Sequence, residues 1–236
     1  MACSAASEYS FQHQPYASLP RDVLPAAQAA IDTGIADGRR IYPFGHSYGA
    51  YSVYSLVEQS GIFAAAAAIN GPSNLLTEYL DLDPNLRYEP WAFEVPAAQA
   101  ELETAHRVMS LGDVPWRAFD KYIENSPIRY VDRIHTPLLI FHSDTDVFDM
   151  HQADDMFAGL KRLGKEARYV RFCGEPHSLD SPANIRQFWS EMISDSMNIR
   201  KLDSSNGIAI SEDIRELTRK ERANVVAFSG ESHCSK

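Results

Sequence analysis

The chain has 236 residues, of which 44% are hydrophobic, and its 32 acidic side chains exceed its 22 basic ones to give a net charge of −10. An apolar fraction of this size excludes a chain that is disordered throughout, because such chains lack the side chains that offset the entropy of folding. The acidic balance argues against a nucleic-acid-binding protein, which needs basic residues to neutralise phosphates. We therefore expect one soluble globular domain with additional terminal segments.

The most apolar run, residues 62–69, is far shorter than the roughly 20 residues that a membrane-spanning helix needs. The first residues lack the basic start and apolar stretch of a secretory signal, so we expect a cytoplasmic protein without a membrane partner. The cysteines are three and far apart, which suits neither a disulfide framework nor a metal cluster: Cys3, Cys173 and Cys234. We accordingly expect no metal and no other cofactor.

Three zones follow one another along the chain. Residues 1–19 are polar and irregular, and we interpret them as an N-terminal arm. Residues 20–195 carry nearly all of the periodic apolar pattern and form the predicted domain. Residues 196–236 have roughly balanced charge and are predicted to be a polar tail. A helix capped by Ser211 is one interpretation of this tail, and a solvated appendage is the interpretation we prefer.

The predicted domain begins with a helix over 20–35, where apolar residues recur at helical spacing and Asp22 suits the dipole of the first turn. A short buried strand is predicted over 40–44, followed by a helix over 48–59. The next segment, 63–69, contains five consecutive alanines, which suit either a helix or a closely packed strand. Its position between a helix and a turn favours the strand.

The second half of the domain opens with a longer stretch, residues 71–126, that holds proline, tryptophan and several short helical patterns. The continuous apolar run over 136–143 predicts a strand that is buried on both faces. Strands and helices then alternate, with a helix at 151–163, a strand at 167–172 and a helix at 184–193. Such alternation predicts an α/β fold in which helices cover both faces of a mostly parallel sheet.

The sequence GHSYG around Ser47 fits the pattern G-x-S-x-G. Its context strengthens the match, because an apolar strand ends at Phe44 and a helix opens at Tyr48, as a nucleophile elbow requires. The helix N-terminus beneath the serine offers backbone N–H groups to an oxyanion. We therefore predict that Ser47 is a nucleophile and that the N–H of Tyr48 is the first oxyanion donor.

The two glycines of this motif, Gly45 and Gly49, have a steric explanation. An elbow holds its serine in a strained backbone conformation, close to the neighbouring strand and helix. Side chains at both glycine positions are predicted to collide with those neighbours.

A serine hydroxyl is a weak nucleophile near neutral pH, so it needs a base and an acid that orients the base. In this fold class the acid and then the histidine follow the serine along the chain. The strand over 136–143 is followed by Asp144 and Asp146, and the strand over 167–172 is followed by His177. Parallel sheets place their sites at these strand ends, so either aspartate could orient His177.

Eight histidines compete for the role of base. His46 lies in the elbow beside the nucleophile, and His142 belongs to a strand, where we expect it to be buried and hydrogen-bonded. Only His177 has the right chain order and loop context. The others are read as surface residues, residues flanking elements or part of the 71–126 stretch: His13, His106, His135, His151 and His233.

The ordered segments GHSYG, NSP, TPLLIFH, a following aspartate and GEPH resemble the catalytic domain of the prolyl oligopeptidase family of serine peptidases, over about 21–195. The resemblance implies an α/β-hydrolase fold. It also implies that Ser47 is the nucleophile, Asp146 the orienting acid and His177 the base. Asp146 is preferred to Asp144 because it matches the last residue of the family's HGxxD pattern.

The function implied by this resemblance is the hydrolysis of peptide bonds through an acyl-enzyme intermediate. Two alternatives remain: an esterase for small molecules on the same triad, and a fragment that is silent or depends on a partner. The substrate is accordingly expected to be a peptide or a small ester.

The chain departs from the family pattern at several positions of the site. Ser143 replaces the glycine of HG, Ala50 replaces the second glycine after the serine, and Pro176 stands in GEPHS where the family has GEGHG. In addition, Pro43 lies in the predicted nucleophile strand, where it cannot donate a ladder hydrogen bond.

Only 46 residues precede Ser47, whereas family members carry several strands and usually a β-propeller before their nucleophile. The resemblance therefore implies an N-terminally incomplete chain, in which the family's second oxyanion donor, an upstream tyrosine, has no counterpart; neither Tyr9 nor Tyr16 is assigned to it. The sheet edge beside the nucleophile strand is expected to be unpaired, which favours self-association.

Overall fold

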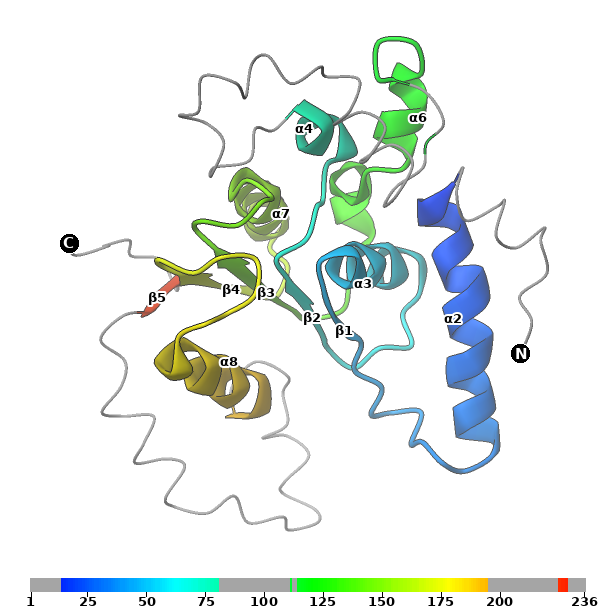
Figure 1. Ribbon diagram of the computed structural model, residues 1–236. Coiled ribbons are helices and arrows are strands. Elements are labelled where there is room, and N and C mark those ends of the chain that lie inside the picture. Colours follow the sequence, from blue (N-terminus) through cyan, green and yellow to red (C-terminus); the bar gives the residue numbers. More distant parts are fainter. Residues whose placement is uncertain (1–13, 81–110, 112–113, 195–224, 229–236) are drawn as a thin grey trace, which may run out of the picture.

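The computed structural model describes residues 14–80, 111, 114–194 and 225–228 (Figure 1). Among these residues, no helix is long and apolar enough to cross a bilayer. The helices are α2 (Pro15–Asp32), α3 (Tyr48–Gln59), α4 (Leu75–Leu80), α6 (Phe119–Glu124), the 3-10 helix η2 (Pro127–Arg133), α7 (His151–Arg162) and α8 (Pro182–Ser194). The strands are β1 (Phe44–His46), β2 (Ala66–Ile69), β3 (Leu138–Ser143), β4 (Ala167–Phe172) and β5 (Val225–Phe228).

The strands form one sheet in the order β1-β2-β3-β4-β5. The first four strands are parallel, and Gly45 of β1 lies opposite Ala68, which in turn lies opposite Ile140 of β3. The pairing of β4 with β5 is antiparallel. The predicted parallel sheet is confirmed, and all its parallel strands present their carboxyl ends at one edge.

Helices cover both faces of this sheet, as the alternation predicts (Figure 1). On one face, Ile140 packs with Val53 of α3 and Met156 of α7. On the other face, Phe141 packs with Phe188 of α8, their ring centroids 4.8 Å apart. Because neighbouring residues of β3 point to opposite layers, a continuous apolar strand is needed here.

The alanine run forms a strand and not an extension of a helix. Ala66, Ala67 and Ala68 lie in β2 and have no solvent exposure. Their small side chains let α3 pack closely over the strand, so that Ala66 and Ala68 share a core cluster with Tyr54. The preference for a strand is therefore confirmed.

The first helix begins at Pro15, five residues before the predicted start at Pro20, so residues 15–19, which were assigned to the irregular arm, are helical. Pro20 has no N–H to donate to the carbonyl of Tyr16 within the helix. That carbonyl instead accepts hydrogen bonds from the side chains of Ser55 and Gln59 of α3, both at 2.8 Å. Two side chains distant in sequence thus replace the hydrogen bond that Pro20 cannot make. The helix can therefore continue through a proline of the kind that normally marks a helix start.

The strand before Ser47 was predicted to be buried and to span residues 40–44, and both parts of this prediction are wrong. The strand is Phe44–His46, and it lies at the edge of the sheet, where the Phe44 side chain is 58% exposed. Pro43 precedes it and contributes only its carbonyl, which accepts from the N–H of Ala67 at 3.0 Å. Within the described part of the chain, β2 is the only neighbour of β1, so the expected open edge is confirmed there.

The C-terminal tail differs from both of its interpretations where it is described, because Val225–Phe228 form the edge strand β5. Most of the helix that Ser211 would cap lies outside the described residues. The 71–126 stretch contains the short helices α4 and α6, as its patterns suggest, and residues 81–110 within it also lie outside the described part.

Candidate active site

Ser47 lies between β1 and α3 in the strained conformation that was predicted, with φ 61° and ψ −125°. Such backbone costs about 1–3 kcal/mol in a residue other than glycine and persists only where the surroundings enforce it. The carbonyl of Ser47 accepts the first hydrogen bonds of α3, from the N–H groups of Ala50 at 2.9 Å and Tyr51 at 3.3 Å. The serine side chain makes no capping bond to the helix, so its hydroxyl is not needed to start α3.

Close backbone packing explains one of the two motif glycines. A Cβ on Gly45 would lie 2.2 Å from the carbonyl oxygen of Gly49, which no side chain can tolerate. The predicted collision at Gly49 itself is wrong, because a Cβ there would meet nothing within 4 Å. The second tight position is Gly71, after β2, where a Cβ would lie 2.4 Å from both the Ser47 carbonyl oxygen and the Ala50 side chain. The sequence interpretation missed Gly71.

These contacts predict that alanine has opposite effects on the free energy of unfolding at Gly45 and at Gly49. Gly45→Ala is expected to lower the free energy of unfolding by about 3 kcal/mol, because the new methyl group must displace the backbone of Gly49. Gly49→Ala is expected to raise it by about 0.5 kcal/mol, because alanine favours the helix and meets no neighbour. Urea denaturation of both variants measures the two changes in the free energy of unfolding. Equal changes in the two variants would contradict the packing described for Gly45 and Gly49.

Asp146 and His177 meet in a hydrogen bond of 2.8 Å between Oδ1 and Nδ1. Asp146 is 1% exposed, and the same carboxylate oxygen accepts from the N–H of Phe148 at 3.0 Å. A carboxylate can only accept, so Nδ1 of His177 carries the hydrogen and Nε2 is left as the basic nitrogen. Asp144, the alternative acid, is exposed and accepts from the N–H of Gly174 at 2.6 Å.

The loops that carry Asp146 and His177 are bonded to each other through Glu175. Thr145 donates to the Glu175 carbonyl from its N–H at 3.2 Å and from its hydroxyl at 2.7 Å. The buried Glu175 carboxylate accepts from the N–H of Asp180 at 2.7 Å and from the Asn184 side chain at 2.5 Å. Glu175 thereby anchors the His177 loop to the start of α8, a role that the sequence interpretation did not assign.

His142 is buried in β3 and hydrogen-bonded, as predicted. Its Nε2 lies 2.9 Å from the carbonyl oxygen of Phe148, and it therefore carries the hydrogen. Burial lowers the pKa of His142 below its usual value, which favours the neutral ring. The Phe148 ring in turn stands edge-on to His177, with centroids 5.5 Å apart. His142 therefore supports the wall of the site and does not compete with His177 as the base.

Asn70 joins β2 to the neighbouring strand end and was also missed by the sequence interpretation. Its side-chain oxygen accepts from the N–H of Ser143 at 2.9 Å. Its amide nitrogen donates to the Ser143 hydroxyl at 3.0 Å and to the His177 carbonyl at 2.7 Å. The serine that stands in place of the family's glycine thus has a specific partner.

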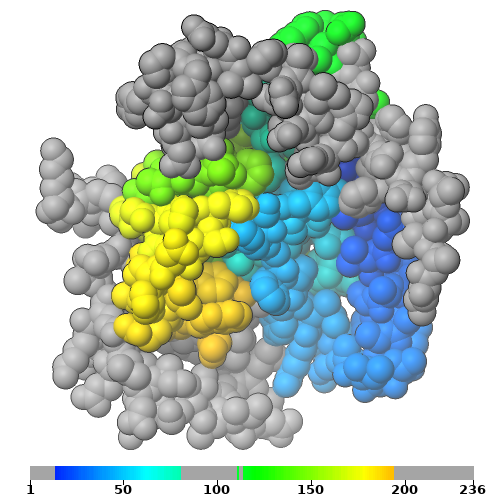
Figure 2. Space-filling model, viewed as in Figure 1, coloured from blue at the N-terminus to red at the C-terminus, as the bar shows by residue number. Residues whose placement is uncertain are grey.

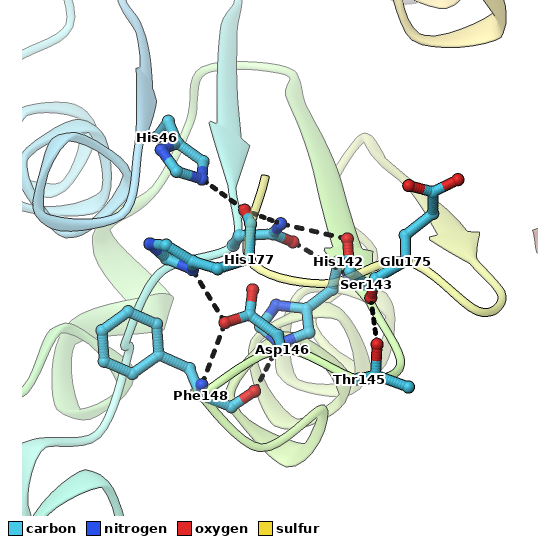
Figure 3. A network of polar contacts seen from close by, with 9 residues as sticks. His46, His142, Ser143, Thr145, Asp146, Phe148, Glu175 and His177 are labelled. Carbon is cyan, nitrogen blue, oxygen red and sulfur yellow. Dashed lines mark hydrogen bonds and ion pairs between the residues drawn. The ribbon is translucent and has the colours of Figure 1, made fainter. Parts of the chain in front are cut away.

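The elbow reaches the His177 loop through His46 (Figure 3). Its Nε2 lies 2.6 Å from the His177 carbonyl oxygen, and the two ring centroids are 4.4 Å apart. Figure 2 shows the yellow segment that follows β4 lying against the light-blue segment from β1 to α3. The three predicted residues therefore belong to one region, although within the described chain no hydrogen bond joins the Ser47 hydroxyl to the His177 ring. The described residues contain no group of three or more His, Cys, Asp or Glu side chains placed to hold a metal ion.

Two curated proteins show how this chain resembles known peptidases in sequence. YuxL of Bacillus subtilis, an uncharacterized peptidase, is 30% identical over 169 residues, which are 70% of this chain and 23% of that protein. The acylamino-acid-releasing enzyme of Arabidopsis thaliana is 28% identical over 165 residues, which are 69% of this chain and 20% of that protein. This chain thus spans less than a quarter of the length of either relative.

The fold is shared with solved α/β-hydrolase structures. A puromycin-hydrolyzing peptidase of Mycobacterium tuberculosis superimposes with a TM-score of 0.62 and 23% identity, over 74% of this chain and 24% of that one. The model of the prolyl oligopeptidase family matches residues 12–194, which is most of this chain and includes all the residues of the site. The chain therefore belongs to the prolyl oligopeptidase family.

Proposed function

We propose that this chain contains the catalytic centre of a serine peptidase, with Ser47 as nucleophile, His177 as base and Asp146 as orienting acid. The observation that carries the proposal is the 2.8 Å bond between the buried Asp146 and His177. His177 contacts His46, the residue before a strained serine whose side chain does not cap α3. Strain at a polar residue next to an oriented imidazole is typical of hydrolase sites.

In the proposed reaction, Ser47 Oγ attacks the carbonyl carbon of the substrate while His177 Nε2 takes the hydroxyl proton. The imidazolium formed in this step is stabilised by the Asp146 carboxylate at Nδ1. The proton then passes to the leaving amine, which departs and leaves an acyl group on Ser47. Water, activated by the same imidazole, releases the acid and restores the serine.

Negative charge develops on the substrate oxygen, and the start of α3 supports its stabilisation. Tyr48 is the first residue of this helix, so its N–H points with the positive end of the helix dipole toward the serine side of the elbow. We assign this N–H as one oxyanion donor. Removing one such donor typically lowers turnover by 10²–10³-fold and does not abolish it. We therefore expect a site with a single donor to react with an activated probe, although more slowly than a site with two.

A fluorophosphonate probe tests the proposal on the purified full chain, since it reacts only with an activated serine. Covalent labelling of the parent at Ser47, read by mass spectrometry of the peptides, is the expected result. Ser47→Ala should not label, and Ser60→Ala, at the other end of the same helix, should label as the parent does.

The outcomes of this experiment also separate the alternatives. A folded parent that does not label would overturn the proposal and favour a silent or partner-dependent fragment. A parent that labels but cleaves only p-nitrophenyl esters, and none of a panel of peptide p-nitroanilides, would favour an esterase on the same residues.

We also propose that the open edge at β1 mediates self-association. Phe44 is largely exposed there, and the N–H and carbonyl groups on the outer side of this strand have no strand neighbour among the described residues. Light scattering on the labelled sample reports the oligomeric state. A monomer that persists at high concentration would contradict this assembly.

A further inference from the structure

The backbone of His177 receives two side-chain hydrogen bonds from the opposite half of the sheet. His46, at the end of β1, approaches the His177 carbonyl oxygen with Nε2 at 2.6 Å, and Asn70, after β2, donates to it at 2.7 Å. His177 itself lies in the loop after β4, two strands away from β2. These two bonds therefore link parts of the site that the strand order keeps apart (Figure 3).

The side chains of Asn70 and His46, which contact this carbonyl, differ in their burial. Asn70 is buried and also bonded to Ser143, so it forms part of the interior that joins β2 to β3. His46, in contrast, is exposed. Its ring contacts His177 in two ways, through the bond to the carbonyl and through the neighbouring ring, with the two ring centroids 4.4 Å apart.

His46 also precedes Ser47 directly in the chain, in the strained elbow. A bond from His46 to His177 therefore connects the backbone of the nucleophile to the backbone of the base without passing through the core. Asp146 and Phe148 determine which way the His177 ring faces, but both belong to the loop after β3. Neither sets the distance between that ring and the elbow.

We infer that His46 is a positioning residue, which holds the His177 loop at the distance from Ser47 that proton transfer requires. A carbonyl can only accept, so the required group is the N–H at Nε2 of His46. This inference rests on the proposed function. It assigns a task to the residue before the serine, which the sequence interpretation set aside as lying beside the nucleophile.

The test compares substitutions that keep or remove this donor. His46→Leu keeps a bulky side chain without an N–H and is expected to slow fluorophosphonate labelling of Ser47 by about 10²-fold, as expected for a displaced catalytic group. His46→Gln restores a side-chain N–H of similar reach and is expected to label within about threefold of the parent. His135→Leu, at an exposed histidine before β3, is the matched control and should label at the parent rate.

A purely structural role would not give this pattern, because glutamine and leucine would then slow labelling alike. Circular dichroism melting checks that each variant folds. Should His46→Leu fail to fold, His46→Ser serves in its place, since a hydroxyl there is too short to reach the carbonyl. Labelling of His46→Leu at the parent rate, or of His46→Gln as slowly as His46→Leu, would overturn the inference. A parent that does not label would overturn the proposed function, and this inference with it.

Discussion

Replacing the nucleophile, Ser47→Ala, is expected to lower kcat by about 10⁶-fold on any substrate that the parent hydrolyses, because no other group can form the acyl intermediate. The fold should survive this change. The Ser47 side chain makes no capping bond, and alanine keeps the strained backbone at φ 61°, so the free energy of unfolding should stay within about 0.5 kcal/mol of the parent. Steady-state kinetics and urea denaturation of the same preparation measure both quantities.

A glycine variant at position 47 separates the contribution of the hydroxyl to catalysis from the cost of the strained backbone to stability. Ser47→Gly should be as inactive as the alanine variant but more stable than the parent by about 1 kcal/mol, since glycine adopts a positive φ without strain. If the glycine variant were instead less stable than the alanine variant, the elbow would not be strained. If the alanine variant kept more than one hundredth of the parent kcat, Ser47 would not be the nucleophile.

The second large effect is expected at the orienting acid, where Asp146→Asn should lower kcat by about 10⁴-fold. An amide has the size of the carboxylate and still reaches His177 Nδ1, but it carries no charge to stabilise the imidazolium. An amide turned the other way would donate to Nδ1 and move the ring hydrogen to Nε2, where it prevents the ring from acting as a base. KM should change much less than kcat, because the affected interaction strengthens in the transition state.

The neighbouring aspartate offers a matched control for this variant. Asp144→Asn keeps an oxygen that can accept from the N–H of Gly174, so kcat should stay within about threefold of the parent. A loss at Asp144 that equals the loss at Asp146 would show that the loop tolerates no amide, and the assignment of the acid would fall.

The sequence predicts the fold and the site wherever the signal is local. The apolar run over 136–143 predicts β3 to within two residues, since a strand buried on both faces needs it, and the predicted bounds of β4 are the observed ones. The turn at Ser47 and the helix that follows it are also predicted correctly, although the strand before them is not. Chain order and strand ends pick out His177 and leave Asp144 and Asp146 as candidates for its partner. The family's HGxxD pattern favours Asp146, and the structure brings that carboxylate to 2.8 Å from His177.

Features that depend on distant partners escape this reasoning. Pro20 suggests a helix start, because the sequence cannot reveal that Ser55 and Gln59 replace its missing hydrogen bond. Asn70 and Gly71 follow a strand in an ordinary turn-like segment, and only the close approach of β3 and α3 reveals their tasks. For Gly71 the sequence held a partial signal, since a glycine directly after a strand can mark a close approach of another backbone.

The contact between His46 and His177 also has a consequence for the order in which the domain folds. Asp146 and His177 are 31 residues apart, whereas His46 and His177 are separated by 131 residues. Closing the longer loop costs about 1.3 kcal/mol more in chain entropy than closing the shorter one. The acid and the base can therefore meet within the C-terminal half alone, but the nucleophile joins them only when both halves have docked. On the proposed function, the reactivity of Ser47 is therefore expected to report the integrity of the whole domain, and a half-folded chain is expected not to react with the probe.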